Sequence, residues 1–272
     1  MTRLKENDIS QLGISLAAYD RLLCDRAGVG LAGIAAHATE KECGKIDGLL
    51  RGMRVAAVPI TYGQGVISGF SRAVQNIVEF LGASCFVTDR TSLQGLAEAV
   101  EKRADVIFLA DDDYFLALRP SSGVTAENSA ATGYGYGAAL DLMSGGVNKR
   151  DVLVLGAGPV GQAAVGYLCR RGARVHLLDP DLSRTRAVVA QYPSVQTAGN
   201  ILEAMERCDL ILEATPAEKV IPLQAVTERT IIAAPGVPLG FDEQVEEALT
   251  GRFVHDVLEI GVATMLYTVL ID

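Results

Sequence analysis

The chain is poor in the residues that build metal sites and disulfide frameworks. It has no tryptophan, three histidines and five scattered cysteines without a CxxC pair, namely Cys24, Cys43, Cys85, Cys169 and Cys208. Metal-thiolate sites space their cysteines closely and regularly, so we expect reduced thiols and no metal. There is also no uncharged apolar run of about 18 residues, the length that a membrane-spanning helix needs.

Basic residues are fewer than acidic residues in this chain. Lysine and arginine number 24 against 33 aspartates and glutamates, which gives a net charge of −9. A nucleic-acid backbone or an anionic membrane surface attracts the opposite balance, so neither is an expected partner. The beginning, MTRLKENDISQLG, is polar and lacks the apolar core of a signal peptide. We therefore predict a cytoplasmic globular protein that acts on a small molecule.

Short apolar runs alternate with helical patterns in a first series. Residues 1–50 have apolar residues at helical spacing and no strand pattern. Strands are then predicted at 54–60, 83–89 and 104–113, with the glycine-rich turn YGQGVISG and helices over 70–81 and 92–103 between them; Ser92 is the expected cap of the second helix. This alternation is typical of βαβ units and a parallel sheet.

A second series begins at Asp151. Strands are predicted at 151–158, 173–181, 208–216, 229–238 and 251–257, and a long helix over 128–146 bridges the two series. We therefore predict the α/β class with two lobes and a cleft between them. Residues 1–145 would form a helical N-terminus with a small α/β substrate lobe, and residues 146–272 a Rossmann dinucleotide-binding lobe.

The most informative motif is LVLGAGPVGQAA, which contains G-x-G-x-x-G as Gly156, Gly158 and Gly161. The first glycine permits the tight turn, the second lets the backbone approach a pyrophosphate, and the third lets the helix pack on the strand. The helix would begin at Pro159 and Val160, and its first turn offers free N–H groups to phosphates. A strand precedes the motif, which makes it more specific than the glycines alone.

An acidic residue stands where this motif requires one. Asp179, followed by Pro180, ends the next predicted strand 23 residues after Gly156. Its carboxylate can accept hydrogen bonds from a ribose 2′-hydroxyl and would repel a 2′-phosphate. The nearby Arg184 and Arg186 come later, in the following helix. These features favour NAD over NADP as cofactor, and the alternative is a Rossmann-like domain without a cofactor.

Two later turns fit the same interpretation. Thr215 and Pro216 follow one strand, and Ala234 and Pro235 follow the next. The carboxyl ends of strands in such sheets bind the ligand, so these residues are expected to line the cofactor. Their alternative is ordinary turn chemistry, because proline and glycine mark any turn.

No histidine or lysine stands in a recognisable catalytic setting. His176 lies inside a predicted strand and His37 has no partner in the sequence, whereas His255 and Asp256 follow a strand near the expected nicotinamide. The run VIFLADDDYF is the remaining candidate, because an apolar strand ends there in three carboxylates.

Asp111, Asp112 and Asp113 allow three interpretations. They could form a solvated turn with a helix cap, bind a metal, or hold a substrate ammonium group. Adjacent carboxylates repel one another unless a cation or hydrogen-bond donors stabilise them. No further metal ligands lie nearby in the sequence.

Three segments together resemble the pyrrolysine synthase family. They are FLADDDYF, then AENSAATGYGYGAALDLMSGG leading directly into VLVLGAGPVG, and HDVLEIGVATML near the C-terminus. The resemblance covers roughly residue 100 to the end and is weaker over the first 50 residues. It implies a fold similar to that of amino-acid dehydrogenases.

The resemblance also implies a reaction. Family members oxidise, with NAD, the terminal primary amine of a lysine acylated on Nε by 3-methyl-D-ornithine; ammonia is lost and the α-amine closes the pyrroline ring. Under this hypothesis Asp111, Asp112 or Asp113 contacts a substrate amine, and Asn128, Ser129 and Thr132 line the cleft near the nicotinamide. Ile260 and Gly261 would touch the cofactor.

The N-terminal helices carry an apolar stripe that includes Leu4, Ile9 and Leu12. This stripe could close over the substrate as a lid, or it could pack on its own lobe or in a homodimer. Rival functions are another two-lobe dehydrogenase, of the shikimate or methylene-tetrahydrofolate type, and a non-catalytic NAD sensor. Both rival enzymes use a first-lobe lysine, and no lysine follows these strand ends.

Overall fold

The computed structural model of the protein describes residues 15–61 and 69–270. The chain divides into two compact units. One contains the chain up to Arg21, Leu31–Ala131 and the chain from Val257 onward; the other contains Leu22–Gly30 and Thr132–Asp256. The division departs from a single boundary at residues 145/146, since most of helix α7 (Asn128–Met143) joins the second unit and helix α12 (Glu259–Val269) joins the first.

The first unit is built on a five-stranded sheet with the order β2-β1-β3-β4-β5. Its strands are β1 (Arg54–Pro59), β2 (Ser84–Val87), β3 (Val106–Ala110), β4 (Phe115–Arg119) and β5 (Val124–Glu127). The predicted strands β1, β2 and β3 are parallel, as expected. Strands β4 and β5 run antiparallel as a hairpin that the sequence pattern did not predict.

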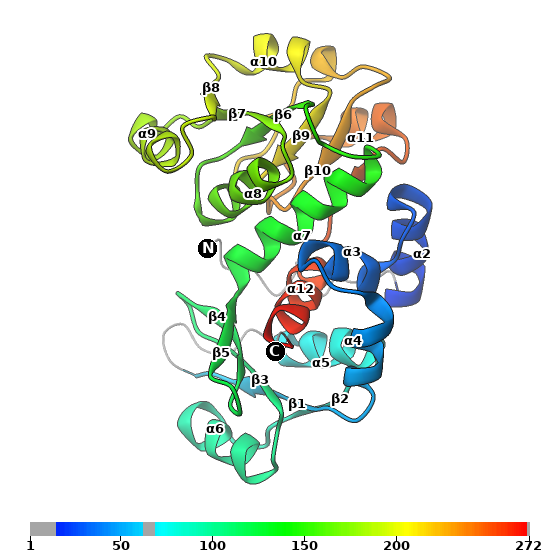
Figure 1. Cartoon of the computed structure of the whole chain (residues 1–272), viewed down its shortest axis with the longest axis vertical. Helices are drawn as coiled ribbons and strands as arrows, with labels where there is room; N and C mark the ends of the chain where they lie inside the picture. The colour runs from blue at the N-terminus through cyan, green and yellow to red at the C-terminus, as the bar shows by residue number, and fades with distance from the viewer. Residues whose placement is uncertain (1–14, 62–68, 271–272) are drawn as a thin grey trace. The chain divides into compact units, whose positions relative to one another are not determined.

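Helices cover both faces of this sheet. Figure 1 shows α6 (Ser92–Glu101) on one side of the strands, and α5 (Phe70–Phe80) with α12 on the other. Alternation along β1 explains this, because Ala56 and Val58 pack toward Ala99 of α6 and the intervening residues face the opposite way. Helix α12 contacts α3 (Leu31–Ala38), α5, β4 and β5. Helices α2 (Leu16–Ala27) and α4 (Cys43–Leu50) complete the N-terminal part, which has no strand between residues 15 and 50.

The start of α6 corrects one prediction. The N-cap is Thr91 rather than Ser92, and its side chain makes no capping bond. The Ser92 hydroxyl instead accepts a hydrogen bond from the Thr61 amide (3.1 Å). The buried Glu98 accepts the amides of Asp89 and Arg90 at 3.1 and 2.9 Å, so it holds the loop between β2 and α6.

The second unit contains a six-stranded parallel sheet with the order β11-β10-β9-β6-β7-β8. Its strands are β6 (Asp151–Leu155), β7 (Arg174–Leu178), β8 (Gln196–Thr197), β9 (Leu210–Glu213), β10 (Ile231–Ala233) and β11 (Phe253–Val254). The order reverses at β6, so the carboxyl ends of β6 and β9 meet at the switch point where such sheets bind dinucleotides. This confirms the predicted Rossmann lobe.

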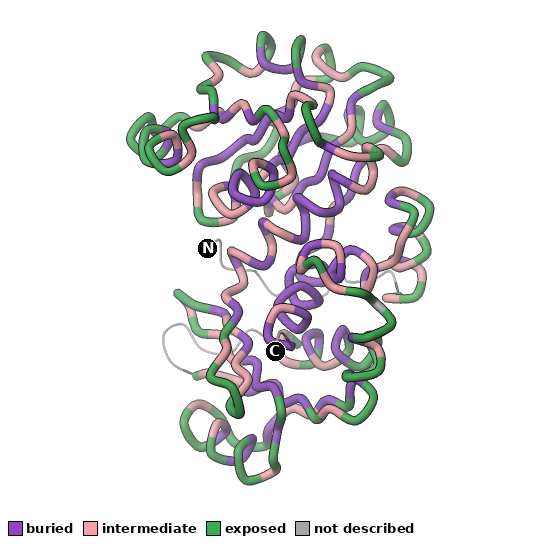
Figure 2. The backbone as a smooth tube through the Cα atoms, in the orientation of Figure 1, coloured by how far each residue is buried: buried purple, intermediate pink, exposed green. Residues whose placement is uncertain are grey.

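Buried strands and amphipathic helices make up the core of this unit, and Figure 2 shows its strands largely buried. One face carries an apolar cluster that joins Leu153, Leu155 and Ile211 to α10 (Ile201–Arg207) and α11 (Glu243–Leu249). The remaining helical elements are α8 (Pro159–Arg170), α9 (Leu182–Gln191) and the 3-10 turn η1 (Leu223–Ala225). Helix α7 lies so close to α8 that a Cβ on Gly133 would collide with the backbone at Val160 and Ala164.

Candidate functional site

The predicted glycine-rich turn joins β6 to α8. Gly156 has φ +96°, and a Cβ there would lie 2.6 Å from the Ala214 carbonyl oxygen. A Cβ on Gly161 would overlap the Gly156 carbonyl, so the close packing of helix on turn requires glycine. Gly158 differs, because none of the described residues lies within 4 Å of the Cβ position and its φ of −71° suits any residue. Gly158 therefore leaves room that the described part of the chain does not fill.

The N-terminus of α8 borders this room. Gly158 is the N-cap and has no side chain to cap the helix, and Pro159 occupies the first helical position. The amides of the first turn, those of Val160 and Gly161 included, precede the first intrahelical hydrogen bonds, and the helix dipole places partial positive charge there. The structure thus places a helix N-terminus at the predicted position, and such an end offers donors to an anion.

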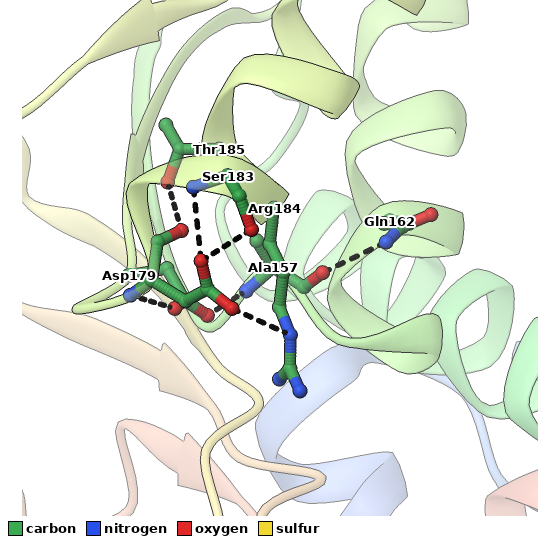
Figure 3. A network of polar contacts seen from close by, with 7 residues as sticks. Ala157, Gln162, Asp179, Ser183, Arg184 and Thr185 are labelled. Atoms are coloured by element: carbon green, nitrogen blue, oxygen red, sulfur yellow. Dashed lines mark hydrogen bonds and ion pairs between the residues drawn. The ribbon is translucent and has the colours of Figure 1, made fainter.

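Asp179 directly follows β7 and turns back toward the glycine-rich turn. Its Oδ2 accepts a hydrogen bond from the Ala157 amide at 2.6 Å, and its Oδ1 accepts one from the Asp181 amide at 2.7 Å. Figure 3 shows Asp179 beside Ala157, with Gln162 reaching the Ala157 carbonyl from α8. The carboxylate is therefore fixed at the turn and remains partly exposed, as a group that binds ribose hydroxyls must be.

Asp181 caps the next helix and holds the nearest arginine. Its carboxylate accepts hydrogen bonds from the amide (2.9 Å) and hydroxyl (2.6 Å) of Ser183, and it lies 3.4 Å from Nε of Arg184. The hydrogen bonds from Ser183 lower the pKa of Asp181 below its ordinary value. Two carboxylates thus stand at the carboxyl end of β7, and Arg184 is paired with one of them.

The two later turns also meet at the carboxyl edge of this sheet. Thr215 follows β9, and its amide and hydroxyl both donate to Oε1 of Glu213, at 2.8 and 2.5 Å. Ala234 follows β10, donates to the Val254 carbonyl (2.8 Å) and has its own carbonyl bonded to Nδ1 of His255 (2.8 Å). Pro216 and Pro235 come directly after these residues. Sequence reasoning missed Glu213, which a buried strand carries as its last residue.

The acidic run of the first unit forms the turn between β3 and β4. Oδ1 of Asp111 accepts the amides of Asp113 (2.9 Å) and Tyr114 (2.7 Å), and the Asp111 amide donates to the Tyr114 carbonyl (2.9 Å). Asp111 and Asp113 are exposed and Asp112 is half-buried. Asp111 therefore stabilises its own turn.

Helix α7 begins at the predicted residues Asn128 and Ser129. Glu127, which ends β5, accepts the amides of Ser129 (2.8 Å) and Ala130 (3.0 Å), so an unpredicted glutamate caps the helix. Thr132 lies one turn later, in the second unit.

The C-terminal residues predicted to touch the cofactor lie in the first turn of α12. Ile260 and Gly261 are buried there, beside the buried carboxylate of Glu259, which accepts the Leu258 amide at 3.1 Å. Glu259 was not singled out in the sequence. Leu4 and the proposed lid, together with most of the turn YGQGVISG, lie outside the described residues.

The histidines have identifiable partners in the second unit. Nε2 of His176 lies 2.9 Å from Oδ1 of Asp151 at the amino end of the sheet, far from the glycine-rich turn. Arg174 and His176 hold the pKa of Asp151 down at about 2. Within residues 15–61 and 69–270, no three His, Cys, Asp or Glu side chains gather as a possible metal site. Over the same ranges no helix is both long and apolar enough to cross a membrane.

The fold and the glycine-rich turn define the class as a dehydrogenase-like protein with a Rossmann lobe. Residues 139–242 match the family model for shikimate/quinate 5-dehydrogenase. Shikimate dehydrogenase from Aquifex aeolicus superposes with a TM-score of 0.54 at 14% identity, covering 78% of this chain and 89% of that one. Quinate dehydrogenase from Corynebacterium glutamicum, in complex with NAD, gives 0.54 at 14% identity over 80% and 94%. At these identities the likeness concerns the fold alone.

The sequence comparisons identify the family. Residues 9–126 match the model for the N-terminal domain of pyrrolysine biosynthesis protein PylD. Pyrrolysine synthase from Methanosarcina barkeri is 30% identical over 274 residues, covering 99% of this chain and 98% of that one. The enzyme from Methanosarcina acetivorans is 32% identical over 217 residues, covering 80% and 82%. The chain belongs to the pyrrolysine synthase family, which confirms the predicted resemblance and places it in pyrrolysine biosynthesis.

Proposed function

We propose that the protein oxidises the terminal primary amine of 3-methyl-D-ornithyl-N6-L-lysine with NAD and closes the product to pyrrolysine. The family membership supports the substrate, since both relatives are pyrrolysine synthases. The observation that carries the redox part is the open space at Gly158 beside the fixed carboxylate of Asp179. A glycine with no internal reason to be glycine fits a turn that a diphosphate approaches.

The proposed reaction balances without a further reactant. The terminal amine loses a proton, and its carbon gives up a hydride together with the bonding electron pair. NAD+ supplies the hydride acceptor and leaves as NADH. The iminium carbon is then attacked by the ornithyl α-amine, and ammonia leaves as the C=N bond of the ring forms. The products are pyrrolysine, NADH, a proton and ammonia.

Two sets of residues in the second unit would bind the two halves of the cofactor. The first-turn amides of α8 at Val160 and Gly161 would receive the diphosphate. Asp179 would accept hydrogen bonds from the adenosine ribose, while Asp179 and Asp181 disfavour a 2′-phosphate. The nicotinamide half would then extend over β9 and β10, along Thr215, Pro216, Ala234 and Pro235, because these strands lie on the other side of β6.

The substrate carries several amino groups, and the first unit offers carboxylates. Asp111, Asp112 and Asp113 are the candidates to hold an amine, and Oδ1 of Asp111 also accepts two amides of its own turn. Oxidation requires the reacting amine to be neutral, so these carboxylates would bind a different ammonium group of the substrate and orient the carbon that reacts. A cytoplasmic homodimer remains part of this proposal.

The rival enzymes have weaker support. A shikimate-type or folate-type reaction would use a first-lobe lysine, and the segments after β1, β2 and β3 contain none up to Asp113 apart from Lys102. Lys102 closes α6 at the far end and binds Glu98 at 2.6 Å. A non-catalytic NAD sensor differs from an enzyme in that it would bind the dinucleotide without turnover.

The decisive experiment mixes purified protein, NAD+ and synthetic 3-methyl-D-ornithyl-N6-L-lysine. We expect absorbance to rise at the NADH band, and mass spectrometry to show a product lighter by one ammonia and two hydrogens. A matched reaction uses the ornithyl-lysine whose terminal amine is acetylated, which cannot react. NADH binding without any turnover of the free amine would contradict the substrate assignment and leave the dinucleotide site intact.

A further inference from the structure

Glu213 is a carboxylic acid enclosed in the centre of the Rossmann sheet. It ends β9, pairs in register with Leu155 of β6 and has no exposed surface. Its side chain leaves the sheet on the face that carries Leu155, Ile211 and the cluster around α10 and α11. The carboxyl group therefore lies directly beneath the loops that follow β9 and β10.

One carboxyl group contacts both of these loops. Oε1 accepts the Thr215 amide at 2.8 Å and the Thr215 hydroxyl at 2.5 Å, which fixes the turn after β9. The loop after β10 is joined to the same residue, because the Gly236 amide donates to the Glu213 carbonyl at 3.1 Å. Gly236 and Gly240 also lie flush against the side chain, and a Cβ on either would collide with the carboxyl group. The absence of side chains at these two glycines therefore leaves space that the Glu213 side chain fills.

Burial of this carboxyl group costs free energy that its contacts must offset. Oε2 has no hydrogen-bond partner among the described residues. Burial raises the pKa of Glu213 to about 7, so the neutral acid is much more populated than in a solvated glutamate. A carboxyl in an apolar cluster is expensive compared with an aliphatic side chain of the same volume. Its presence therefore points to what it holds in place, the two loops at the carboxyl edge.

We propose that Glu213 is a positioning residue for the nicotinamide half of the dinucleotide. It fixes the Thr215 turn by its two hydrogen bonds and the loop from Ala234 to Gly240 by packing, so that both loops present one preformed surface. This inference rests on the proposed function, because it assumes that a dinucleotide binds along β9 and β10. A neutral glutamine can make the same acceptor contacts, whereas an alanine can make none.

The test measures NADH affinity by the fluorescence of NADH itself, which the absence of tryptophan makes simple to observe. We expect Glu213→Ala to weaken binding about tenfold or more, the equivalent of the two lost hydrogen bonds. Glu213→Gln should restore affinity to within about threefold of the unsubstituted protein. Glu213→Asp, which withdraws the carboxyl by one methylene, should be weakened like the alanine variant, and it serves in its place if the alanine variant does not fold.

A matched control separates positioning from stability. Asp141 is also a buried carboxylate of the second unit; it accepts the Val147 amide at 2.8 Å and pairs with Arg171 at 3.0 Å, at the end of α8 opposite Gly158. Asp141→Asn should lower the melting temperature and leave the NADH affinity unchanged.

Three results decide the matter. Glu213→Ala or Glu213→Asp with lowered melting temperature but ordinary NADH affinity would overturn the inference and leave a structural role. Glutamine as weak as alanine would also overturn it, because the acceptor contacts would then be irrelevant. If the unsubstituted protein binds no NADH, the failure belongs to the proposed function, and the positioning role falls with it.

Discussion

The Ala157 amide donates a 2.6 Å hydrogen bond to Oδ2 of Asp179, which joins the glycine-rich turn to the end of the neighbouring strand (Figure 3). The Asp181 amide holds the other carboxylate oxygen at 2.7 Å. The acid is therefore oriented before any ligand arrives, and a ribose would meet a group that needs no rearrangement. This arrangement determines what a substitution at Asp179 should do.

Asp179→Ala should weaken NADH binding about tenfold, since a charge-assisted hydrogen bond to the ribose and the orientation of the turn are both lost. NADPH binding should weaken less or improve, because a negative charge near the 2′-phosphate disappears. The ratio of the two dissociation constants, from fluorescence titrations, is the measurement. Asp151→Ala at the opposite edge of the sheet is the control and should leave the ratio unchanged. An unaltered ratio in Asp179→Ala would mean that another residue selects the dinucleotide.

Local sequence patterns were enough to predict most of the second unit. Strands β6, β7, β9 and β10 and helix α8 follow from apolar runs and turn residues that lie close together in the sequence. The glycine-rich turn and Asp179 were predictable for the same reason, since Gly156 and Gly161 answer local demands of backbone conformation and close packing. The cap at Asp181 follows the rule for residues before a helix.

Interactions between distant residues were beyond the sequence patterns. The β4–β5 hairpin consists of two short strands joined through residues 120–123. The turn before it, between β3 and β4, is set by side-chain bonds of Asp111 that only the folded backbone reveals. Glu213 looks like an ordinary polar end of a strand until Gly236 and Gly240 fold over it. Glu127 precedes α7 directly, and its capping role depends on strand β5 ending where it does.

Gly158 and Gly161 should respond differently to the same added methyl group. Gly158→Ala leaves the chain unhindered, so its melting temperature should change little while NADH binding weakens, because the methyl fills space that the diphosphate needs. Gly161→Ala should be severely destabilised, because the methyl overlaps the Gly156 carbonyl. Thermal unfolding and NADH titration distinguish the two effects. Ordinary NADH affinity in Gly158→Ala would remove the diphosphate from this turn.

The three aspartates of the β3–β4 turn should separate into structural and ligand-binding groups. Asp111→Ala should lower stability by about 1–2 kcal/mol, because two amides of the turn lose their acceptor. Asp112→Asn and Asp113→Asn should keep the fold, and at least one should raise KM for the ornithyl-lysine about tenfold if it binds an ammonium group. The KM for NAD+ should stay unchanged in both, which serves as the internal control. Ordinary substrate kinetics in all three variants would refute the amine-binding hypothesis.

The buried acid Glu213 should make the protein less stable as the pH rises from 5 to 8. Its pKa is raised from an ordinary 4.5 to about 7, so the carboxyl group ionises in the unfolded chain at a lower pH than in the folded protein. Ionisation therefore stabilises the unfolded state relative to the folded state through this interval. The penalty is absent below pH 4.5, grows up to pH 7 and is complete above it, where it amounts to about 3 kcal/mol. Glu213→Gln cannot ionise, so its stability relative to the unsubstituted protein should improve by about 2.5 kcal/mol between pH 5 and 8.

Urea unfolding at several pH values measures this difference, and Glu98→Gln provides a control of opposite sign. The bonds from Lys102 and from the amides of Arg90 and Asp89 lower the pKa of Glu98 to about 2. Its stabilising contribution is therefore complete above pH 4.5 and lost only in stronger acid, so the Glu98→Gln difference should be constant from pH 5 to 8. If the Glu213→Gln difference is equally constant, Glu213 ionises as a solvated acid does, and burial beneath the two loops does not control its charge.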